Sequence, residues 1–184
     1  MGVRITECEI PGVLELESDL FRDSRGYFTE FFNAEAARAL GFDQTFVQDN
    51  LSCSARGVLR GLHYQLNPHA QGKLIRCVTG SIFDVCVDIR VGSPTYGQYV
   101  KRELSAEQGN ALWVPEGFAH GFISLEDDTN VMYKCTTHWA NGMEATIRYD
   151  DPEIGIDWPF EPTMVNQKDL DAPGLADAEN NFTF

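Results

Sequence analysis

The chain has 184 residues, of which 43% are hydrophobic and 23% charged, so it is long enough to fold as one globular domain with its own core. It contains no run of about 18 apolar residues, and its N-terminus lacks the apolar core of a signal peptide, so we expect no membrane span and a cytoplasmic location. The formal net charge is −14 and the Lys and Arg residues are scattered, which argues against binding to nucleic acid because such binding needs a basic face.

The first predicted element is a helix over the run AEAARAL, residues 34–40. Asn33 precedes this run as an N-cap and Gly41 follows it as a C-terminal stop. Farther along, the chain reads as short strands separated by Gly and Pro, namely GVLRGLHYQ, KLIRCV, SIFDVCVDIR, QYVKREL, ALWVP, FISL and NVMYKCT. Many short strands at this spacing predict a β-sandwich or β-barrel.

The clearest strand, SIFDVCVDIR, has two different faces. One face carries Phe83, Val85, Val87 and Ile89, and the other carries Asp84, Cys86, Asp88 and Arg90. The second face suits the wall of an interior cavity, and it suits an exposed outer face equally well.

Five cysteines are present, an odd number, and none forms a CxxC motif. Three of them lie in apolar strand-like runs. We therefore expect reduced core residues without a disulfide or metal role at Cys8, Cys53, Cys77, Cys86 and Cys135.

Two spaced motifs point to a particular kind of barrel. Residues Gly109 to His120 read G-x5-P-x-G-x2-H, which resembles the second cupin motif. The first cupin motif begins G-x5-H-x-H; His63 matches its first histidine, but Gln65 stands at the second. Instead of the next acidic ligand the chain offers Lys73. An ammonium has no lone pair for a metal, so we expect no metal here. A fixed cation can stabilise an enolate formed beside a ketone.

Seven runs resemble the dTDP-4-dehydrorhamnose 3,5-epimerase family over residues 4–170: LFRDSRGYFTEFFN, VQDNLSCSARGVLRGLHYQ, GKLIRCVTGSIFDVCVDIRVGSPTYG, VPEGFAHGF, NVMYKCT, IRYDDPEIGIDWP and QKD. The resemblance implies an all-β fold, a cupin-type jelly-roll β-barrel with short flanking helices. It implies one domain over 1–184, with a segment of about 1–50 exchanged across a homodimer, a barrel of about 51–160 and a C-terminal segment 161–184.

The resemblance also implies a reaction. The family inverts the two carbons beside the carbon-4 ketone of dTDP-4-keto-6-deoxyglucose, giving dTDP-4-keto-L-rhamnose for lipopolysaccharide or cell-wall polysaccharide, without a cofactor. The family's base matches His63, its orienting carboxylate Asp169, its acid Tyr133 and its enolate-stabilising cation Lys73. Without the resemblance, the residues alone favour a core position for Tyr133 and a solvated surface position for Lys73.

Arg60 belongs to the implied site together with His63, although strict strand alternation places the two on opposite faces. A bulge at Gly61 could re-aim one side chain, or the long arginine could reach around the strand edge.

For substrate binding, the family grips the nucleotide with a segment that matches Phe21 to Glu30. The resemblance assigns Arg25 to the diphosphate, Phe28 and Glu30 to the nucleoside, and Trp139 to stacking on thymine. It assigns the remaining contacts to Gln48, Asn50, Arg60, His120, Glu144 and Lys168.

The chain departs from the family pattern at His138, Trp139, Asn141, Gly142 and Asn166. The departures at His138, Trp139, Asn141 and Gly142 bear on nucleobase packing and sugar preference. Two alternatives therefore stay open: a single-carbon epimerase acting on another dTDP-4-keto deoxysugar, and a cupin that binds sugar without catalysis or depends on a metal.

Overall fold

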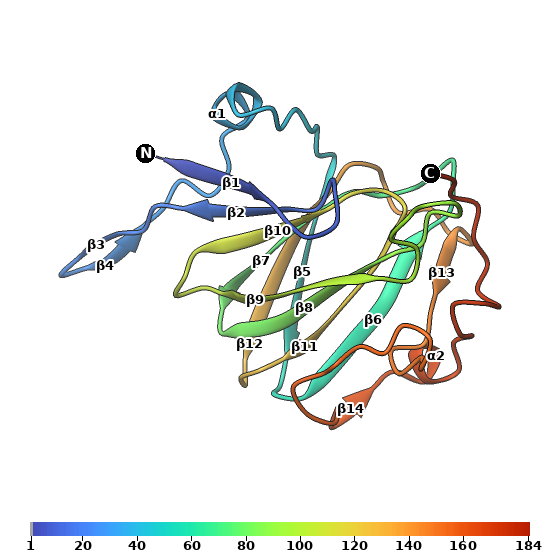
Figure 1. The fold of residues 1–184 in the computed structure, drawn as a ribbon. Coiled ribbons are helices and arrows are strands. Elements are labelled where there is room, and N and C mark those ends of the chain that lie inside the picture. The colour runs from blue at the N-terminus through green and yellow to red at the C-terminus, as the bar shows by residue number, and fades with distance from the viewer. Residues whose placement is uncertain (1) are drawn as a thin grey trace.

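The computed structural model describes residues 2–184 and contains two facing β-sheets (Figure 1). The first sheet has the order β1 (Val3–Glu7), β2 (Leu14–Ser18), β10 (Asn110–Val114), β7 (Lys73–Thr79), β12 (Thr129–Cys135), β5 (Gln48–Ser54). The second has the order β13 (Glu144–Thr146), β6 (Val58–Gln65), β11 (Phe118–Ser124), β8 (Ser81–Asp88), β9 (Tyr99–Ser105), and β14 (Met164–Val165) pairs with β6. The predicted all-β fold is confirmed.

The interior between the sheets is filled from both sides by strand residues. Ile75 and Leu112 come from the first sheet, and Ile82, Cys86 and Phe122 come from the second. The side chains of the Asp84 face of β8 therefore point inward, which answers the question that alternation alone left open. Val85, Val87 and Ile89 pack on the opposite side of the second sheet, beneath the C-terminal segment.

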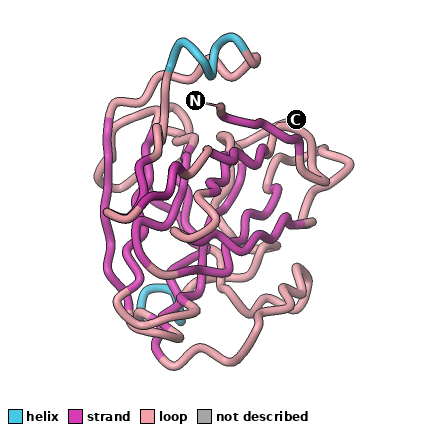
Figure 2. The backbone as a smooth tube through the Cα atoms, turned by 90° about the vertical axis from the view of Figure 1, so that its left-hand side faces the viewer, coloured by secondary structure: helices cyan, strands magenta, loops and turns pink. Residues whose placement is uncertain are grey.

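The outer side of the first sheet is covered by α1 (Ala34–Ala39) and the residues that follow it. As predicted, the Asn33 side chain caps this helix and accepts hydrogen bonds from the backbone of Glu35 and Ala36. Gly41 follows with φ +86°, the left-handed conformation that ends many helices. The second helix, α2 (Gln167–Leu170), lies at the opposite end of the molecule from α1, as Figures 1 and 2 both show.

All five cysteines are free thiols within residues 2–184, and Cys77, Cys86 and Cys135 are buried in strands as expected. Cys8 is only half-buried and Cys53 is exposed, so the expected core position is wrong for Cys53. No helix in this described part of the chain is long and apolar enough to cross a membrane.

A bulge interrupts the pairing of β6 with β11. The register pairs His63 with His120 and Arg60 with Phe122, so Gly61 and Leu62 together stand opposite Gly121. One extra residue restores Arg60 and His63 to the same face of the strand. The bulge that the sequence left as one of two explanations is therefore present.

The N-terminal hairpin of β3 (Phe21–Asp23) and β4 (Gly26–Phe28) projects away from the barrel (Figure 1). Its aromatic side chains are exposed, with Phe28 at 60% and Tyr27 at 48%. Large exposed apolar groups on a projecting element indicate an interaction surface.

Candidate active site

A cavity of about 220 Å³ opens between the two sheets. The first sheet contributes one wall from β5, β7 and β12, the second sheet contributes the other from β6 and β11, and α2 with its cap closes one side. The lining consists of Ser52, Arg60, His63, Lys73, His120, Phe122, Tyr133, Asn166 and Asp169. All four predicted catalytic residues, and two of the predicted binding residues, thus meet in one place.

His63 and Asp169 form a hydrogen-bonded pair across this cavity wall. The Nε2 atom of His63 lies 2.6 Å from Oδ1 of Asp169, whose residue is 1% exposed. The other carboxylate oxygen accepts a hydrogen bond of 3.2 Å from the backbone N–H of Gly61. With Nε2 donating to the carboxylate, Nδ1 is left as the proton acceptor, and no group among residues 2–184 bonds to it.

A second histidine–carboxylate pair lies in the same wall. Nε2 of His120 lies 2.8 Å from Oδ1 of Asp84, and Asp84 is completely buried. Burial raises the pKa of Asp84, while the nearby His120 and Lys73 oppose that rise. The Oδ2 atom has no hydrogen-bond partner within the described chain. Asp84 thereby orients His120 from behind, as Asp169 orients His63.

Lys73 is 9% exposed rather than solvated, and its Nζ donates to the carbonyl oxygen of His63 at 3.3 Å. Burial lowers the pKa of the ammonium, and the carboxylates of Glu144 and Asp84 work against that lowering. A buried cation with one weak protein acceptor is suited to receive a developing negative charge.

Tyr133 lies on β12, on the wall opposite His63 of β6. Its ring packs against the interior core while the residue also lines the cavity, so both sequence interpretations of this residue describe part of its surroundings. Burial raises the pKa of the phenol, and Arg60 partly offsets this rise. A phenol in this position keeps its proton at neutral pH and can donate it.

Several predicted binding residues do not line the cavity. Gln48 and Asn50 on β5 are joined by a 3.1 Å hydrogen bond. The side-chain Oε1 of Gln48 accepts a hydrogen bond of 2.8 Å from the backbone N–H of Trp139. Lys168 and Glu144 form an ion pair of 3.4 Å with each other.

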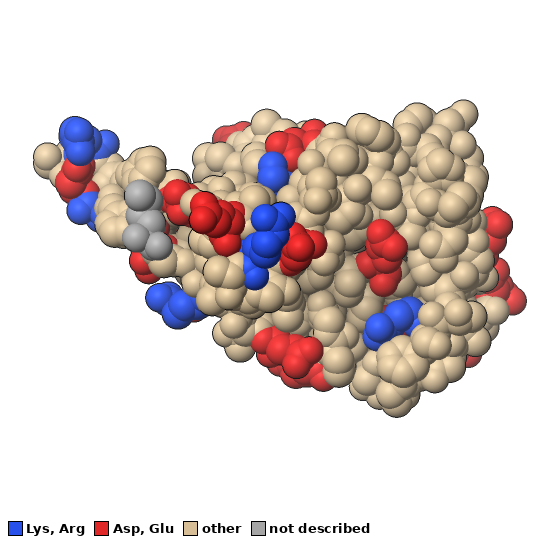
Figure 3. Space-filling model, turned by 90° about the horizontal axis from the view of Figure 1, so that it is seen from above, with Lys and Arg blue, Asp and Glu red and all other residues tan. Residues whose placement is uncertain are grey.

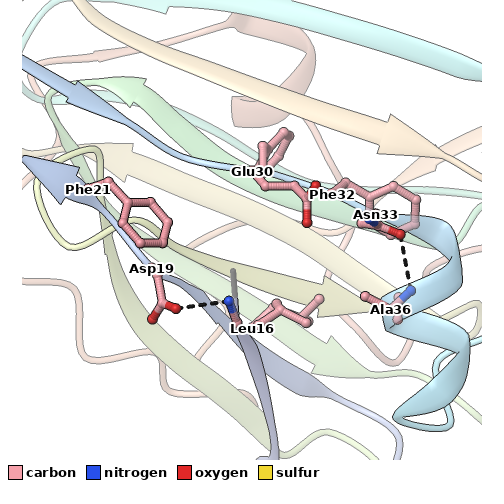
Figure 4. Close-up of a pocket in the computed structure, with 11 residues that line it drawn as sticks. Leu16, Asp19, Phe21, Glu30, Phe32, Asn33 and Ala36 are labelled. Atoms are coloured by element: carbon pink, nitrogen blue, oxygen red, sulfur yellow. Dashed lines mark hydrogen bonds between the residues drawn. The ribbon is translucent and has the colours of Figure 1, made fainter.

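The predicted diphosphate and nucleoside contacts of the N-terminal segment do not join the cavity of their own chain. Arg25 lies at the tip of the hairpin with its side chain 87% exposed, paired with Asp23. Figure 3 shows acidic and basic side chains together at this projecting end. Glu30 lines a different, small hollow of about 20 Å³ beside β2 and α1, where Figure 4 places it with Phe21 and Phe32.

His63 and His120, the two histidines that match the cupin motifs, show no metal-binding arrangement. No group of three or more His, Cys, Asp or Glu side chains capable of holding a metal occurs within residues 2–184. Both histidines in the cavity direct Nε2 to a carboxylate, and Gln65 hydrogen-bonds only to backbone.

Sequence reasoning missed Asp84, Ser52 and Phe122 as site residues. The alternation of β8 did place Asp84 on a possible cavity wall, but its contact with His120 joins strands 36 positions apart and has no local signal. Asn166, noted as a departure, caps α2 by accepting the N–H of Lys168 at 3.0 Å. Asn caps a helix as well as Ser does, so this change preserves the cap.

A model of the dTDP-4-dehydrorhamnose 3,5-epimerase family matches residues 7–177. The dTDP-4-dehydrorhamnose 3,5-epimerase of Shigella flexneri is 47% identical over 178 residues, covering 96% of this chain and 98% of that protein. The chain belongs to this family. Members of the dTDP-4-dehydrorhamnose 3,5-epimerase family are isomerases, and this chain is an enzyme of that class.

Solved structures agree with the family assignment. A Legionella pneumophila dTDP-6-deoxy-D-glucose-3,5-epimerase in complex with dTDP-4-keto-L-rhamnose matches with a TM-score of 0.91 at 43% identity, covering 96% of this chain and 94% of that one. This confirms the cupin-type jelly roll. A 3′-monoepimerase from Streptomyces bikiniensis in complex with dTDP-quinovose matches with a TM-score of 0.86 at 37% identity, covering 92% and 87%.

Proposed function

We propose that the chain converts dTDP-4-keto-6-deoxyglucose to dTDP-4-keto-L-rhamnose by inverting carbons 3 and 5. The observation that carries this proposal is the pairing of a histidine base on one cavity wall with a protonated phenol on the opposite wall. His63, oriented by Asp169 at 2.6 Å, and Tyr133 come from different sheets that face each other. A sugar ring between them meets a base on one face and an acid on the other.

In the proposed step, Nδ1 of His63 takes the proton from a carbon beside the ketone. The electron pair of the broken C–H bond forms the carbon–carbon double bond, and the ketone oxygen becomes an enolate oxygen. Lys73 stabilises this oxygen, and Asp169 stabilises the imidazolium. Tyr133 then donates its proton to the same carbon from the opposite face, which inverts its configuration.

Substrate binding is proposed to involve two chains in a homodimer. The exposed hairpin tip, with Arg25 and Phe28, lies outside its own cavity and is suited to reach the diphosphate and nucleoside in a partner. Around the sugar and nucleotide we assign Gln48, Asn50, Arg60, His120, Glu144 and Lys168, with Trp139 stacked on the base. A cytoplasmic location, where nucleotide sugars are made, belongs to the same proposal.

The reaction is proposed to need no metal, because Lys73 supplies the positive charge and Gln65 replaces a histidine ligand. Turnover should therefore survive exhaustive chelation followed by gel filtration. Loss of turnover that one divalent ion restores would support the metal-dependent alternative instead.

A second candidate is inversion at a single carbon of another dTDP-4-keto deoxysugar. The likeness to the Streptomyces bikiniensis 3′-monoepimerase favours it, as do the departures at His138 and Trp139 in the loop after β12. The same base and acid serve both reactions, so only the position of exchange separates them.

The test of the proposed roles replaces His63 with alanine and follows hydrogen exchange from heavy water into the substrate. We expect exchange at both carbons to stop while dTDP still binds, with His69→Ala as the control because His69 is an exposed histidine outside the cavity. Exchange at the wild-type rate in His63→Ala would remove His63 from the role of base.

A further inference from the structure

Gln65 lies at the end of β6 and is 3% exposed, yet the proposed reaction does not use it. Its Nε2 donates to the carbonyl oxygen of His69 at 2.8 Å and to that of His138 at 3.3 Å. Its Oε1 accepts the backbone N–H of Ala140 at 2.8 Å. Both donors and the acceptor of the amide are therefore engaged with backbone groups of two loops.

One of these loops carries Trp139 between the two bonded residues His138 and Ala140. The N–H of Trp139 itself donates 2.8 Å to Oε1 of Gln48 on β5. Three consecutive residues, 138–140, are thus held by two glutamines from opposite sheets. The Trp139 residue is 53% exposed, so packing contributes little to its direction and the backbone must set it.

Only an amide can make this set of contacts at position 65. A carboxylate would place a negative oxygen against the carbonyl oxygens of His69 and His138, and a histidine ring cannot donate twice while accepting once from these directions. Gln65 also lies two residues from His63 on the same strand, so the loop is tied directly to the cavity wall.

We infer that Gln65 is a positioning residue that, together with Gln48, aims Trp139 at the nucleobase of the bound nucleotide. This inference rests on the proposed function, because it requires Trp139 to stack on a base. Gln65 stands where the first cupin motif has its second histidine, and the inference gives it a role in nucleotide affinity through the loop of residues 136–143. Gln65 should affect nucleotide affinity and leave the chemical step unchanged, because none of its hydrogen bonds reaches the side chain of His63, Lys73 or Tyr133.

The experiment compares Gln65→Met with Gln108→Met, because Gln108 is an exposed glutamine in a turn away from the cavity. For Gln65→Met we expect the Kd for dTDP and the KM for substrate to rise about tenfold, as partial loss of base stacking requires, with kcat within about twofold of wild type. Amide hydrogen exchange of residues 138–140 should accelerate in this variant. Gln108→Met should match the wild type in every readout.

A double-mutant cycle with Trp139→Leu gives the decisive comparison. If Gln65 acts through Trp139, the double variant binds dTDP no more weakly than Trp139→Leu alone. Wild-type affinity in Gln65→Met beside weak binding in Trp139→Leu would overturn the inference. Wild-type affinity in Trp139→Leu would instead refute the stacking role in the proposed function. If Gln65→Met does not fold, the same cycle with Gln65→Glu, which keeps the acceptor oxygen but loses the hydrogen bonds donated to His69 and His138, decides the question.

Discussion

The same burial has opposite consequences for two side chains of the cavity. It lowers the pKa of Lys73, because the charged form of an amine is the one that loses hydration, and it raises the pKa of Tyr133, because there the charged form is the phenolate. The proposed acid therefore holds its proton more firmly than a free tyrosine. As the pH rises, we expect Lys73 to lose its proton before Tyr133 does.

This difference predicts the alkaline side of the pH profile. Both groups are required protonated, so activity falls as pH rises through the lower of their pKa values, which we assign to Lys73. Replacing Lys73 with arginine, whose guanidinium stays charged, should move the alkaline fall of kcat/KM to higher pH, even if turnover is reduced. An unchanged alkaline fall in Lys73→Arg, measured by steady-state kinetics, would show that another group sets it.

Tyr133→Phe should separate proton removal from inversion. The enolate can still form and can take deuterium back from His63 on its original face. In heavy water the substrate should exchange its proton with retained configuration, while product formation falls by about 10²–10⁴-fold, the usual loss for a positioned acid. Carbons 3 and 5 are followed separately by NMR. Inversion of both carbons at the wild-type rate would mean that Tyr133 only packs in the core.

At the scale of elements, the bulge in β6 decides which side chains share the cavity. A Cβ at Gly61 would lie 2.4 Å from the Cα of Gly121, and the residue has φ +139°, so alanine meets both a clash and a strained backbone. We expect Gly61→Ala to lower the free energy of unfolding by about 2–5 kcal/mol and to reduce turnover, because Arg60 and His63 lose their common face.

Gly92→Ala is the matched control for that prediction. Gly92 also has a positive φ, +89°, but nothing lies within 4 Å of its would-be Cβ, so it reports backbone strain alone. Its cost should stay at about 1–2 kcal/mol. Equal losses for the two variants in urea unfolding would contradict the close approach of β6 to β11.

The sequence predicted the elements that are determined by neighbouring residues and missed elements that depend on distant contacts. The seven predicted strands carry apolar alternation between Gly and Pro, and α1 is bounded by its own caps at Asn33 and Gly41. Among the strands that were not predicted, β13 and β14 are very short, and β5 is mostly polar with its run QDNLSCS. β2 has the alternating run LELES, but its pairing with distant β10 is a tertiary contact that the local pattern does not reveal.

The site divides in the same way. His63, Tyr133 and Lys73 stand in spaced motifs that a family resemblance can carry, and the structure brings them to one cavity. Asp84 and Gln65 act through contacts made only when loops and strands distant in sequence meet. Such contacts depend on tertiary structure and leave no periodic pattern in the sequence.

At the scale of the whole molecule, exchange of the hairpin between subunits can be tested by complementation. Arg25→Gln and His63→Ala should each be inactive alone. If one chain supplies Arg25 to the cavity of its partner, a mixed dimer contains one cavity with both groups intact. Refolding the two variants together in equal amounts should then recover about a quarter of wild-type turnover. No recovery, with a mixed dimer verified by mass, would mean that each cavity uses its own hairpin or none.

The central claim, that one base and one acid invert two carbons, is tested most directly by wild-type turnover in heavy water. The enzyme is incubated with dTDP-4-keto-6-deoxyglucose, and NMR follows the hydrogens on carbons 3 and 5 of the product. Our account predicts deuterium at both carbons, each with inverted configuration. Deuterium and inversion at one carbon alone, or turnover without any incorporation from solvent, would contradict it.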